Sequence, residues 1–503
     1  MRTLYRASRV HTLSHGPSGE WLLVDGRHVE RTGTGPPPDA ERVVELPGTT
    51  IIPGFIDSHV HLTGTGIVLG APEAAEATSA QELVGSVRSL AAGREEPLLL
   101  PGYDETRWSR PELPSIEELD AASPVPLLLV RTDGHAALAN SAAIDAAGVQ
   151  ETEGLDRDAR GTPTGLATRG ASERLRRWFS ERLSKGDVQG LQLRAAALAA
   201  SRGVTCVHEM SIPKERGLRD LETLLEHRDR LPVDVVTYLA TTDIPQVIDL
   251  RFPRVGGDLA IDGSIGARTA HLSRGYEDGE GSGAAYLDGD ALPEFLHAAH
   301  NAELQVGVHA IGDAAIERLL DAWERVHSTL DSRGRRHFRA RRHRVEHFEM
   351  PSDVQIERAA MLGLAISVQP AFDAEWGHPG ALYDRRLGWD RAGAMNPFRT
   401  LLERGMELGA GSDSPVTPLD PLAGIAALER HHAADQRLSR IDALRLFTWG
   451  SARLAHQEDK KGRLAPGAHA DFAVYDEDPM LAPAIEELRP VLTVSLGREV
   501  FAS

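Results

Sequence analysis

The sequence predicts an α/β fold, a (β/α)8 barrel with insertions, joined to a small β domain that is built from both ends of the chain. Two observations predict it. Strand and amphipathic-helix patterns alternate through the middle of the chain, which is typical of parallel βαβ units. The two ends contain short strand patterns separated by turns. An open doubly wound sheet is the second interpretation of the middle, and two unrelated β appendages are the second interpretation of the ends.

Short strand patterns define the two ends of the chain. Trp21–Val24 precedes Asp25-Gly26, a dipeptide that favours a hairpin turn. Near the other end, Gly497-Arg498 is a turn that follows a strand pattern. The other apolar strand patterns of the two ends are Val43–Leu46, Thr50–Ile52, Ala470–Tyr475 and Val491–Leu496. We therefore expect one β domain that contains both termini.

The middle of the chain repeats a strand-and-helix unit. The strand pattern Leu304–Val308 is followed by apolar residues at helical spacing between Ile316 and Val326. A barrel of such units places its chemistry at the carboxyl ends of the strands, so polar residues should follow them. Further helix-and-strand pairs are Leu191–Ser201 with Val204–Val207, and Phe398–Arg404 with Met406–Ala410.

Composition limits the classes of function. Of 503 residues, 41% are hydrophobic and 26% are charged, as in a globular protein with a large core. The net charge of −19 argues against nucleic acid and anionic membrane as partners. The N-terminus lacks an apolar run of signal-peptide length, and no stretch is long enough for a membrane helix. We therefore expect a cytoplasmic protein, with a homodimer as the default assembly.

The residue types also restrict any metal site. Cys206 is the one cysteine, which excludes a disulfide framework and a cysteine-based zinc cluster. Histidine is plentiful, with 21 residues. His59 and His61 end a strand pattern, and residues i and i+2 of a strand project to one face. The pair can hold one metal ion, although such a pair also arises by chance in a histidine-rich chain.

Three more strand ends carry residues that can bind a metal. His309 follows Val306-Gly-Val308, His347 ends Arg344-Val-Glu-His347, and Asp413 follows a strand of small residues. Each has an ordinary structural interpretation, such as a buried histidine or a turn aspartate. Together they offer imidazole and carboxylate ligands from four strand ends, which suits Zn²⁺ and leaves an open coordination position.

Competing motifs do not fit the sequence. Gly64-Thr-Gly66 lacks the spacing of a dinucleotide-binding loop and follows the histidine pair instead of opening a βαβ unit. Asp262 stands where a serine-hydrolase elbow, GxSxG, requires glycine. There is no Walker A sequence and no HExxH motif.

The sequence resembles the metal-dependent amidohydrolase superfamily, and within it amidohydrolase family 3, the YtcJ-like branch that includes N-substituted formamide deformylases. The similarity extends over nearly the whole chain, and its motifs follow one another in the same order as in the family. The segments that carry it are Pro53–His61, Asp104–Trp108, Asp133–Ser141, Gly203–His208, Asp262–Thr269, Val308–Asp313, His343–His347, Gly411–Val416 and Gly462–Asp471.

The resemblance implies a distorted TIM barrel with a small β-sandwich. The sandwich would contain residues 1–52 and 463–503, and the barrel residues 53–462 with insertions at about 62–200 and 370–395. The resemblance also implies site roles. The metal ligands would be His59, His61, His309, His347 and Asp413, with Asp413 also carrying the proton and His347 counted as catalytic.

Two positions depart from the family pattern. Many relatives have a lysine, which can be carboxylated to bridge two metals, where this chain has Asp258. Aspartate cannot be carboxylated in this way, so we favour a single Zn²⁺. A direct contact of Asp258 with a second metal is the alternative, and a surface position for Asp258 is the third interpretation. Arg169 stands where relatives often have glutamate, so substrate contacts there can differ.

Three residues are candidates for binding substrate. His135 follows the strand pattern Leu127–Val130 and can donate to an oxyanion, or else orders its loop. Trp108 can form an apolar pocket wall, or else pack in the core. Arg344 lies beside His347 and is grouped with these candidates, although with Glu346 it can also brace the site.

The resemblance implies a hydrolase that cleaves a non-peptide C–N bond of a small molecule, such as an amide, formamide or N-acyl compound, through a metal-activated water. A hydrolase or deaminase of a cyclic C–N compound is the alternative. Gly312 stands where deaminase branches often have the glutamate of HxxE, which weakens that alternative. A catalytically inactive, metal-binding regulatory barrel is an alternative of another class, and the retained Asp413 argues against it.

Overall fold

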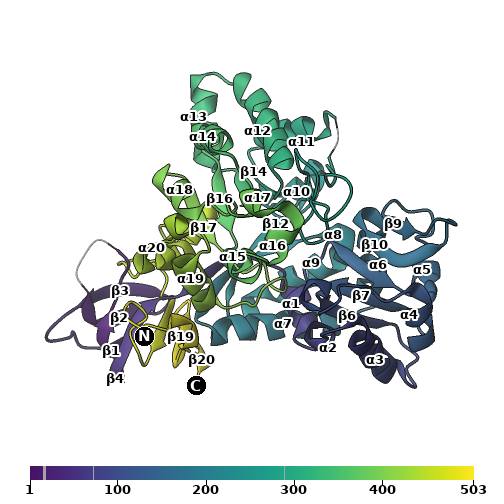
Figure 1. The fold of residues 1–503 in the computed structure, drawn as a ribbon. Helices are drawn as coiled ribbons and strands as arrows, with labels where there is room; N and C mark the ends of the chain where they lie inside the picture. Colours follow the sequence, from purple (N-terminus) through teal and green to yellow (C-terminus); the bar gives the residue numbers. More distant parts are fainter. Residues whose placement is uncertain (15–17, 72, 288) are drawn as a thin grey trace.

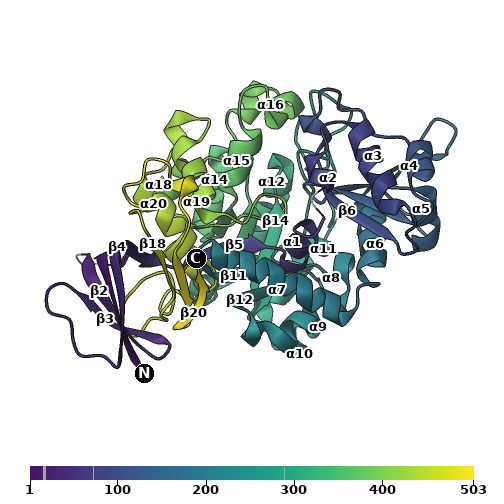
Figure 2. The same ribbon diagram turned by 90° about the horizontal axis from the view of Figure 1, so that it is seen from below.

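A computed structural model describes residues 1–14, 18–71, 73–287 and 289–503. A central region of parallel strands and helices lies between a seven-stranded sheet, which contains both termini, and a separate five-stranded sheet (Figure 1). The same order is seen from below in Figure 2. Within the described ranges, no helix is both long enough and apolar enough to cross a membrane.

The centre contains eight parallel strands that are divided between two sheets, β12-β11-β5 and β13-β14-β15-β16-β17. At one junction Gly256 N donates to Leu239 O over 2.7 Å, and at the other Val60 forms an isolated parallel bridge with Ser414. The strands are β5 (Phe55–Val60), β11 (Val204–Ser211), β12 (Asp234–Leu239), β13 (Arg254–Val255), β14 (Gln305–Ala310), β15 (Arg344–His347), β16 (Ala365–Val368) and β17 (Glu407–Ala410).

The expected closed barrel is therefore not found as one continuous sheet in the described part of the chain. The physical reason is local at the first junction. Strand β13 has only two residues, and Gly256 and Gly257 follow it with φ of 81° and 73°. This left-handed backbone leaves the extended conformation that a strand ladder requires.

Helices cover the outer side of the parallel strands. Helix α12 (Asp313–Ser328) buries the apolar face that the periodicity predicted, including Leu319, Trp323 and Val326. Helix α7 (Lys185–Ser201) extends further toward the N-terminus than the predicted Leu191–Ser201, because Ser184 and Asp187 form a capping box. Other helices of the centre are α1 (Leu62–Val68), α8 (Pro213–Arg216), α9 (Leu218–His227), α10 (Ile244–Asp249), α11 (Ala291–Asn301), α13 (Ser332–Arg341), α14 (Asp353–Leu362), α15 (Pro370–Trp376), α16 (Leu382–Leu387), α17 (Trp389–Ala392), α18 (Phe398–Glu403), α19 (Pro421–Arg430), α20 (Arg440–Arg445) and α21 (Ser451–Leu454).

The two chain ends share one sheet, in the order β20-β19-β18-β4-β1-β2-β3. Strand β4 (Arg42–Pro53) joins them, because it pairs with β1 on one side and with β18 on the other. The strand patterns expected at 43–46 and 50–52 form this single strand, whose register against β1 shifts between Ala7 and Arg9. The remaining strands are β1 (Arg2–Val10), β2 (Gly19–Asp25), β3 (His28–Gly33), β18 (Phe472–Tyr475), β19 (Leu492–Ser495) and β20 (Arg498–Ala502).

The second flanking sheet, in the order β6-β7-β8-β10-β9, lies in the chain between α1 and α7. Its strands and their helices bury a separate apolar cluster that includes Leu83, Leu119 and Leu129. The elements are β6 (Leu98–Tyr103), β7 (Leu127–Arg131), β8 (Ala136–Ala139), β9 (Leu155–Arg157), β10 (Pro163–Thr168), α2 (Glu73–Glu76), α3 (Ala80–Ala91), α4 (Ile116–Ala122), α5 (Ser141–Ala147) and α6 (Arg169–Ser180).

A buried lysine connects the terminal sheet with the centre. Lys461 Nζ lies 2.7 Å from Asp471 Oδ2 and 3.3 Å from Asp234 Oδ2, at 1% side-chain exposure. Replacing Lys461 with alanine leaves buried carboxylate charge without its partner, so we expect the free energy of unfolding to fall by about 3–5 kcal/mol. Denaturant unfolding measures this. The same change at the exposed neighbour Lys460 should have little effect, and equal losses in the two variants would contradict the assignment.

Candidate metal centre

Two strand ends bring the first three site residues together. His59 lies in β5, His61 directly follows it, and Asp413 follows β17 with φ of 54°. Asp413 N donates to His59 O over 2.8 Å, and His61 N donates to Ser414 O over 2.8 Å. These hydrogen bonds hold the ends of β5 and β17 in register, so that the three side chains point to one position.

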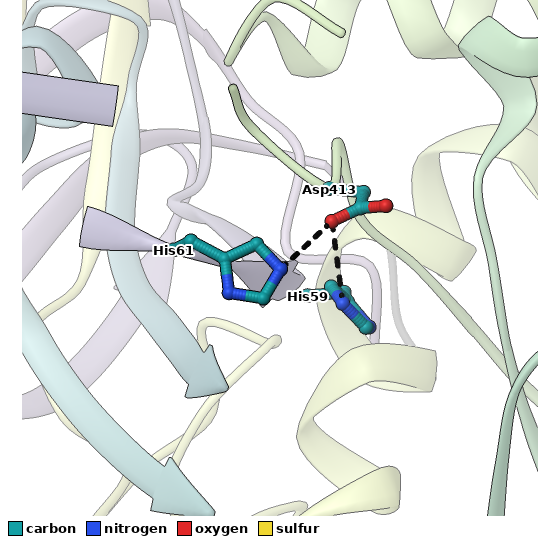
Figure 3. A group of neighbouring side chains, drawn as sticks. All are labelled: His59, His61 and Asp413. Atoms are coloured by element: carbon teal, nitrogen blue, oxygen red, sulfur yellow. Dashed lines mark ion pairs between the residues drawn. The ribbon is translucent and has the colours of Figure 1, made fainter. Parts of the chain in front are cut away.

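The three side chains converge on one carboxylate oxygen (Figure 3). Asp413 Oδ1 lies 3.3 Å from His59 Nε2 and 3.1 Å from His61 Nε2. His59 and Asp413 are buried, and His61 is mostly so. The ligand atoms lie within 4.8 Å of one another, which is close enough to share a metal ion.

The hydrogen bonds of the His59 and His61 rings indicate whether a cation fits between these rings and Asp413. His59 Nδ1 lies 2.9 Å from Glu346 Oε2, and His61 Nδ1 lies 3.0 Å from the carbonyl oxygen of Met210. A carbonyl oxygen and a carboxylate can only accept, so both Nδ1 atoms carry the proton. In the neutral rings the Nε2 lone pairs then face Asp413 Oδ1, which is also an acceptor, and this opposition is relieved by a proton or a metal ion between them. A divalent metal fits this donor set.

A second group lies on the other side of the same cavity. Asp258 Oδ1 lies 3.1 Å from His309 Nδ1 and 3.9 Å from His347 Nε2. Asp258 Oδ2 lies 3.5 Å from His61 Nε2, so this carboxylate lies between the two groups. Its side chain is 16% exposed and in contact with the site, which excludes the surface position considered from the sequence.

The carboxylates change the acid–base properties of these histidines. Burial alone would lower the pKa of His61, but Asp413 and Asp258 outweigh it and raise that pKa to about 9. Burial also opposes the charged form of His309, and the adjacent Asp258 raises its pKa to about 9. Burial lowers the pKa of His347, to which the neighbouring His309 adds. Without a metal, protons on His61 and His309 therefore supply part of the positive charge that balances the carboxylates.

Glu346 and Arg344 support His59 from behind. Arg344 is fully buried and donates to both Glu346 oxygens, from Nε over 2.9 Å and from Nη2 over 2.8 Å. It also donates to Ser58 O and lies 3.0 Å from His208 Nδ1. Arg344 is thus placed beneath the ligands and does not line the pocket.

Changing Glu346 to glutamine is expected to weaken metal binding about 10- to 100-fold, because the carboxylate that fixes the His59 tautomer becomes neutral. A zinc competition titration measures this. Glu280, which is exposed, provides a matched Glu→Gln control. Unchanged zinc affinity in Glu346→Gln would show that His59 does not depend on this hydrogen bond.

The histidine and aspartate side chains open into one pocket. Its lining includes His61, His135, Asp258, His309, His347 and Asp413, with apolar walls at Ile265, Phe372, Trp376 and Leu382. His135 lies over His309, with ring centroids 5.2 Å apart. Burial and the neighbouring His309 lower the pKa of His135 to about 4, so its ring is neutral near pH 7.

Glu349 is a pocket residue that the sequence reasoning missed. It accepts a hydrogen bond of 2.6 Å from the Tyr383 hydroxyl, and burial raises its pKa to about 7. Its spacing in the sequence could have indicated this position, because Glu349 follows His347 by two residues, as His61 follows His59.

The candidate Trp108 and the family-departure position Arg169 lie outside the pocket lining. Trp108 is 5% exposed, donates from Nε1 to Ala77 O over 2.8 Å and packs in the apolar cluster of the β6-to-β9 sheet. Arg169 forms an ion pair of 2.5 Å with Glu153. Neither residue is among those that line the pocket, so the structure brings neither to the metal ligands.

The fold and the ligand cluster define a metal-dependent hydrolase type of site, and comparison with known proteins identifies the family. The sequence profile described as "Amidohydrolase family" matches residues 42–501. The chain therefore belongs to the amidohydrolase family, as the sequence motifs indicated.

Individual relatives agree with this assignment. YtcJ of Bacillus subtilis (strain 168) is 29% identical over 522 residues, which cover 95% of this chain and 95% of YtcJ. The N-substituted formamide deformylase of Arthrobacter pascens is 24% identical over 505 residues, covering 92% of this chain and 90% of that enzyme. The crystal structure of an uncharacterized metal-dependent hydrolase from Pyrococcus furiosus has a TM-score of 0.74 and 29% identity, covering 95% of this chain and 100% of that chain.

Proposed function

We propose that this protein is a zinc-dependent hydrolase that cleaves a non-peptide C–N bond in a small amide, formamide or N-acyl compound. The observation that carries the proposal is the convergence of His59 Nε2, His61 Nε2 and Asp413 Oδ1 at the wall of a pocket. Nitrogen and carboxylate ligands suit Zn²⁺, and three protein ligands leave room for water and substrate.

The proposed chemistry assigns a role to each pocket group. A divalent ion held by His59, His61 and Asp413 would lower the pKa of a water molecule to about 7 and would polarise a substrate carbonyl oxygen. Asp413 accepts the proton from the attacking water and returns it to the leaving nitrogen as the C–N bond breaks. His135, which is neutral and faces the pocket beside His309, donates an N–H to the developing oxyanion. His347 lines the same pocket, beside His309 and Asp258.

The proposal extends to the architecture of the chain. The two parallel sheets would together represent a distorted eight-stranded barrel over residues 53–462, and residues 1–52 with 463–503 a separate sandwich domain. The β6-to-β9 sheet supplies pocket residues such as Val130 and Arg131, so it would contribute to substrate choice. We further propose that the protein acts in the cytoplasm, as a homodimer, without nucleic acid or membrane.

A substrate panel with paired product detection tests the function. Zinc-loaded protein is incubated with N-formyl, N-acyl and cyclic amides, and amine, carboxylate and ammonia are measured separately. We expect a primary amine to appear together with formate or another carboxylate in equal amounts. Ammonia release from a cyclic compound would instead support a deaminase. Stoichiometric metal without turnover of any compound would support a binding protein. The relative from Arthrobacter pascens makes N-substituted formamides the first compounds to test.

A further inference from the structure

We infer that Asp258 is a bridging ligand whose two carboxylate oxygens face two separate divalent-ion positions in the pocket. This inference rests on the proposed function and deepens it, because it concerns how the same site is loaded. It takes the alternative with a second metal ion in place of the single Zn²⁺ that the sequence favoured. The first position is formed by His59, His61 and Asp413, and the second by His309 and His347. Asp258 has one carboxylate oxygen near each group.

The distances place each Asp258 oxygen on a different side. Oδ2 lies 3.5 Å from His61 Nε2, in the first group. Oδ1 lies 3.1 Å from His309 Nδ1 and 3.9 Å from His347 Nε2, in the second group. The ligand atoms of His59, Asp258 and His347 also lie within 4.8 Å of one another. The two groups are thus adjacent enough to share this carboxylate.

The hydrogen bonds of the His309 ring are compatible with a metal ion at the second position. Its Nε2 atom lies 3.4 Å from the carbonyl oxygen of Gly263 and 3.6 Å from Asp262 Oδ1, and both of these are acceptors. Nε2 therefore carries a proton, and in the neutral ring the Nδ1 lone pair faces Asp258 Oδ1. A lone pair opposite a carboxylate oxygen at 3.1 Å is stabilised only by a proton or a metal ion between them.

The backbone before Asp258 explains how so short a side chain reaches both groups. Gly256 and Gly257 have φ of 81° and 73° and lie directly against β14. A Cβ atom on Gly256 would be 1.9 Å from Gly307 O, and one on Gly257 would be 2.6 Å from Met210 Sδ. His309 N donates to Leu259 O over 3.1 Å, which fixes the segment beside the strand that bears His309. The two glycines therefore allow the close approach on which the Asp258 position depends.

A consequence concerns how the site is assembled. A carboxylated lysine needs carbon dioxide to form, whereas aspartate carries its carboxylate already. None of the described residues that line the pocket is a lysine. We therefore expect both ions to bind without bicarbonate.

Metal stoichiometry tests the inference without a substrate. Chelator-treated protein is reconstituted with Zn²⁺ in carbon-dioxide-free buffer, freed of unbound metal and measured by elemental analysis. We expect two ions per chain, and the same number when bicarbonate is added. The Asp258→Asn variant should retain about half of the wild-type content. Asp243→Asn is the matched control, because Asp243 caps α10 at the surface and asparagine caps equally well.

The outcomes separate this inference from the proposed function. One ion per chain in the wild type, bicarbonate-dependent loading, or two ions in Asp258→Asn would overturn the bridge while leaving a zinc hydrolase intact. No specific binding of metal would overturn the proposed function as well. If Asp258→Asn fails to fold, electron paramagnetic resonance of the manganese-loaded wild type decides. A spin-coupled pair supports the bridge, and the spectrum of isolated ions refutes it.

Discussion

Replacing His59 with alanine is expected to reduce amide hydrolysis by about 10³-fold or more and to lower the zinc content. A metal ion supplies several kcal/mol of transition-state stabilisation, and each 1.4 kcal/mol corresponds to about a tenfold change in rate. The orientation of His59, a proposed ligand, is fixed because Glu346 holds its Nδ1 atom and Arg344 holds Glu346. Hydrolysis rates and elemental analysis on the same preparation measure the two effects together.

Two controls separate this loss from misfolding. His297 is exposed on α11, and His297→Ala should keep wild-type activity and zinc. Circular dichroism of the metal-free proteins should agree between wild type and His59→Ala, which shows that the variant still folds. Full activity of chelator-treated wild-type protein would refute a metal-dependent reaction altogether.

Changing Asp413 to asparagine is expected to lower kcat by about 10²- to 10⁴-fold while KM changes little. General acid–base catalysis contributes this range, and an amide cannot take the proton from water or return it to nitrogen. The change is conservative for the backbone, because asparagine tolerates the left-handed conformation that Asp413 adopts at φ 54°. Steady-state kinetics with the amide found in the substrate panel measure kcat and KM separately.

The zinc content of Asp413→Asn distinguishes proton transfer from ligation. The amide oxygen can still face the metal, so we expect most of the zinc to remain, in contrast to His59→Ala. A variant that loses zinc and activity in parallel would assign Asp413 a purely structural role at the metal. A variant with kcat within tenfold of the wild type would exclude it as the proton carrier.

Much of the site could be predicted because its chemistry follows short-range rules. The i, i+2 spacing of His59 and His61 places both on one face of a strand, and His309 and His347 end strands that the apolar patterns identified. The ligand types also followed from composition, since a chain with one cysteine must bind metal through histidine and carboxylate. The terminal strands were recognised in the same way, from their turns.

The differences between expectation and structure concern residues whose surroundings come from distant parts of the chain. Trp108 and Arg344 have side chains suited to a pocket wall, but Trp108 packs under α3 and α4, and Arg344 lies under β5. Glu349 was missed although it lies beside the ligands, because its pocket position depends on positive φ at His347 and Phe348. The closed barrel was predicted only from the alternation of strand and helix patterns. That alternation contains no information on the short strand β13 or on the two glycines that follow it.

The sequence by itself determined the family, the alternating α/β pattern and the residues proposed as metal ligands, because these depend on residue type and spacing along the chain. Only the tertiary structure decided which atoms face one another. The place of Asp258 between His61 and His309 depends on the approach of Gly256 and Gly257 to β14. Such contacts join segments that are far apart in the sequence, so their geometry follows from packing and backbone hydrogen bonds across the fold.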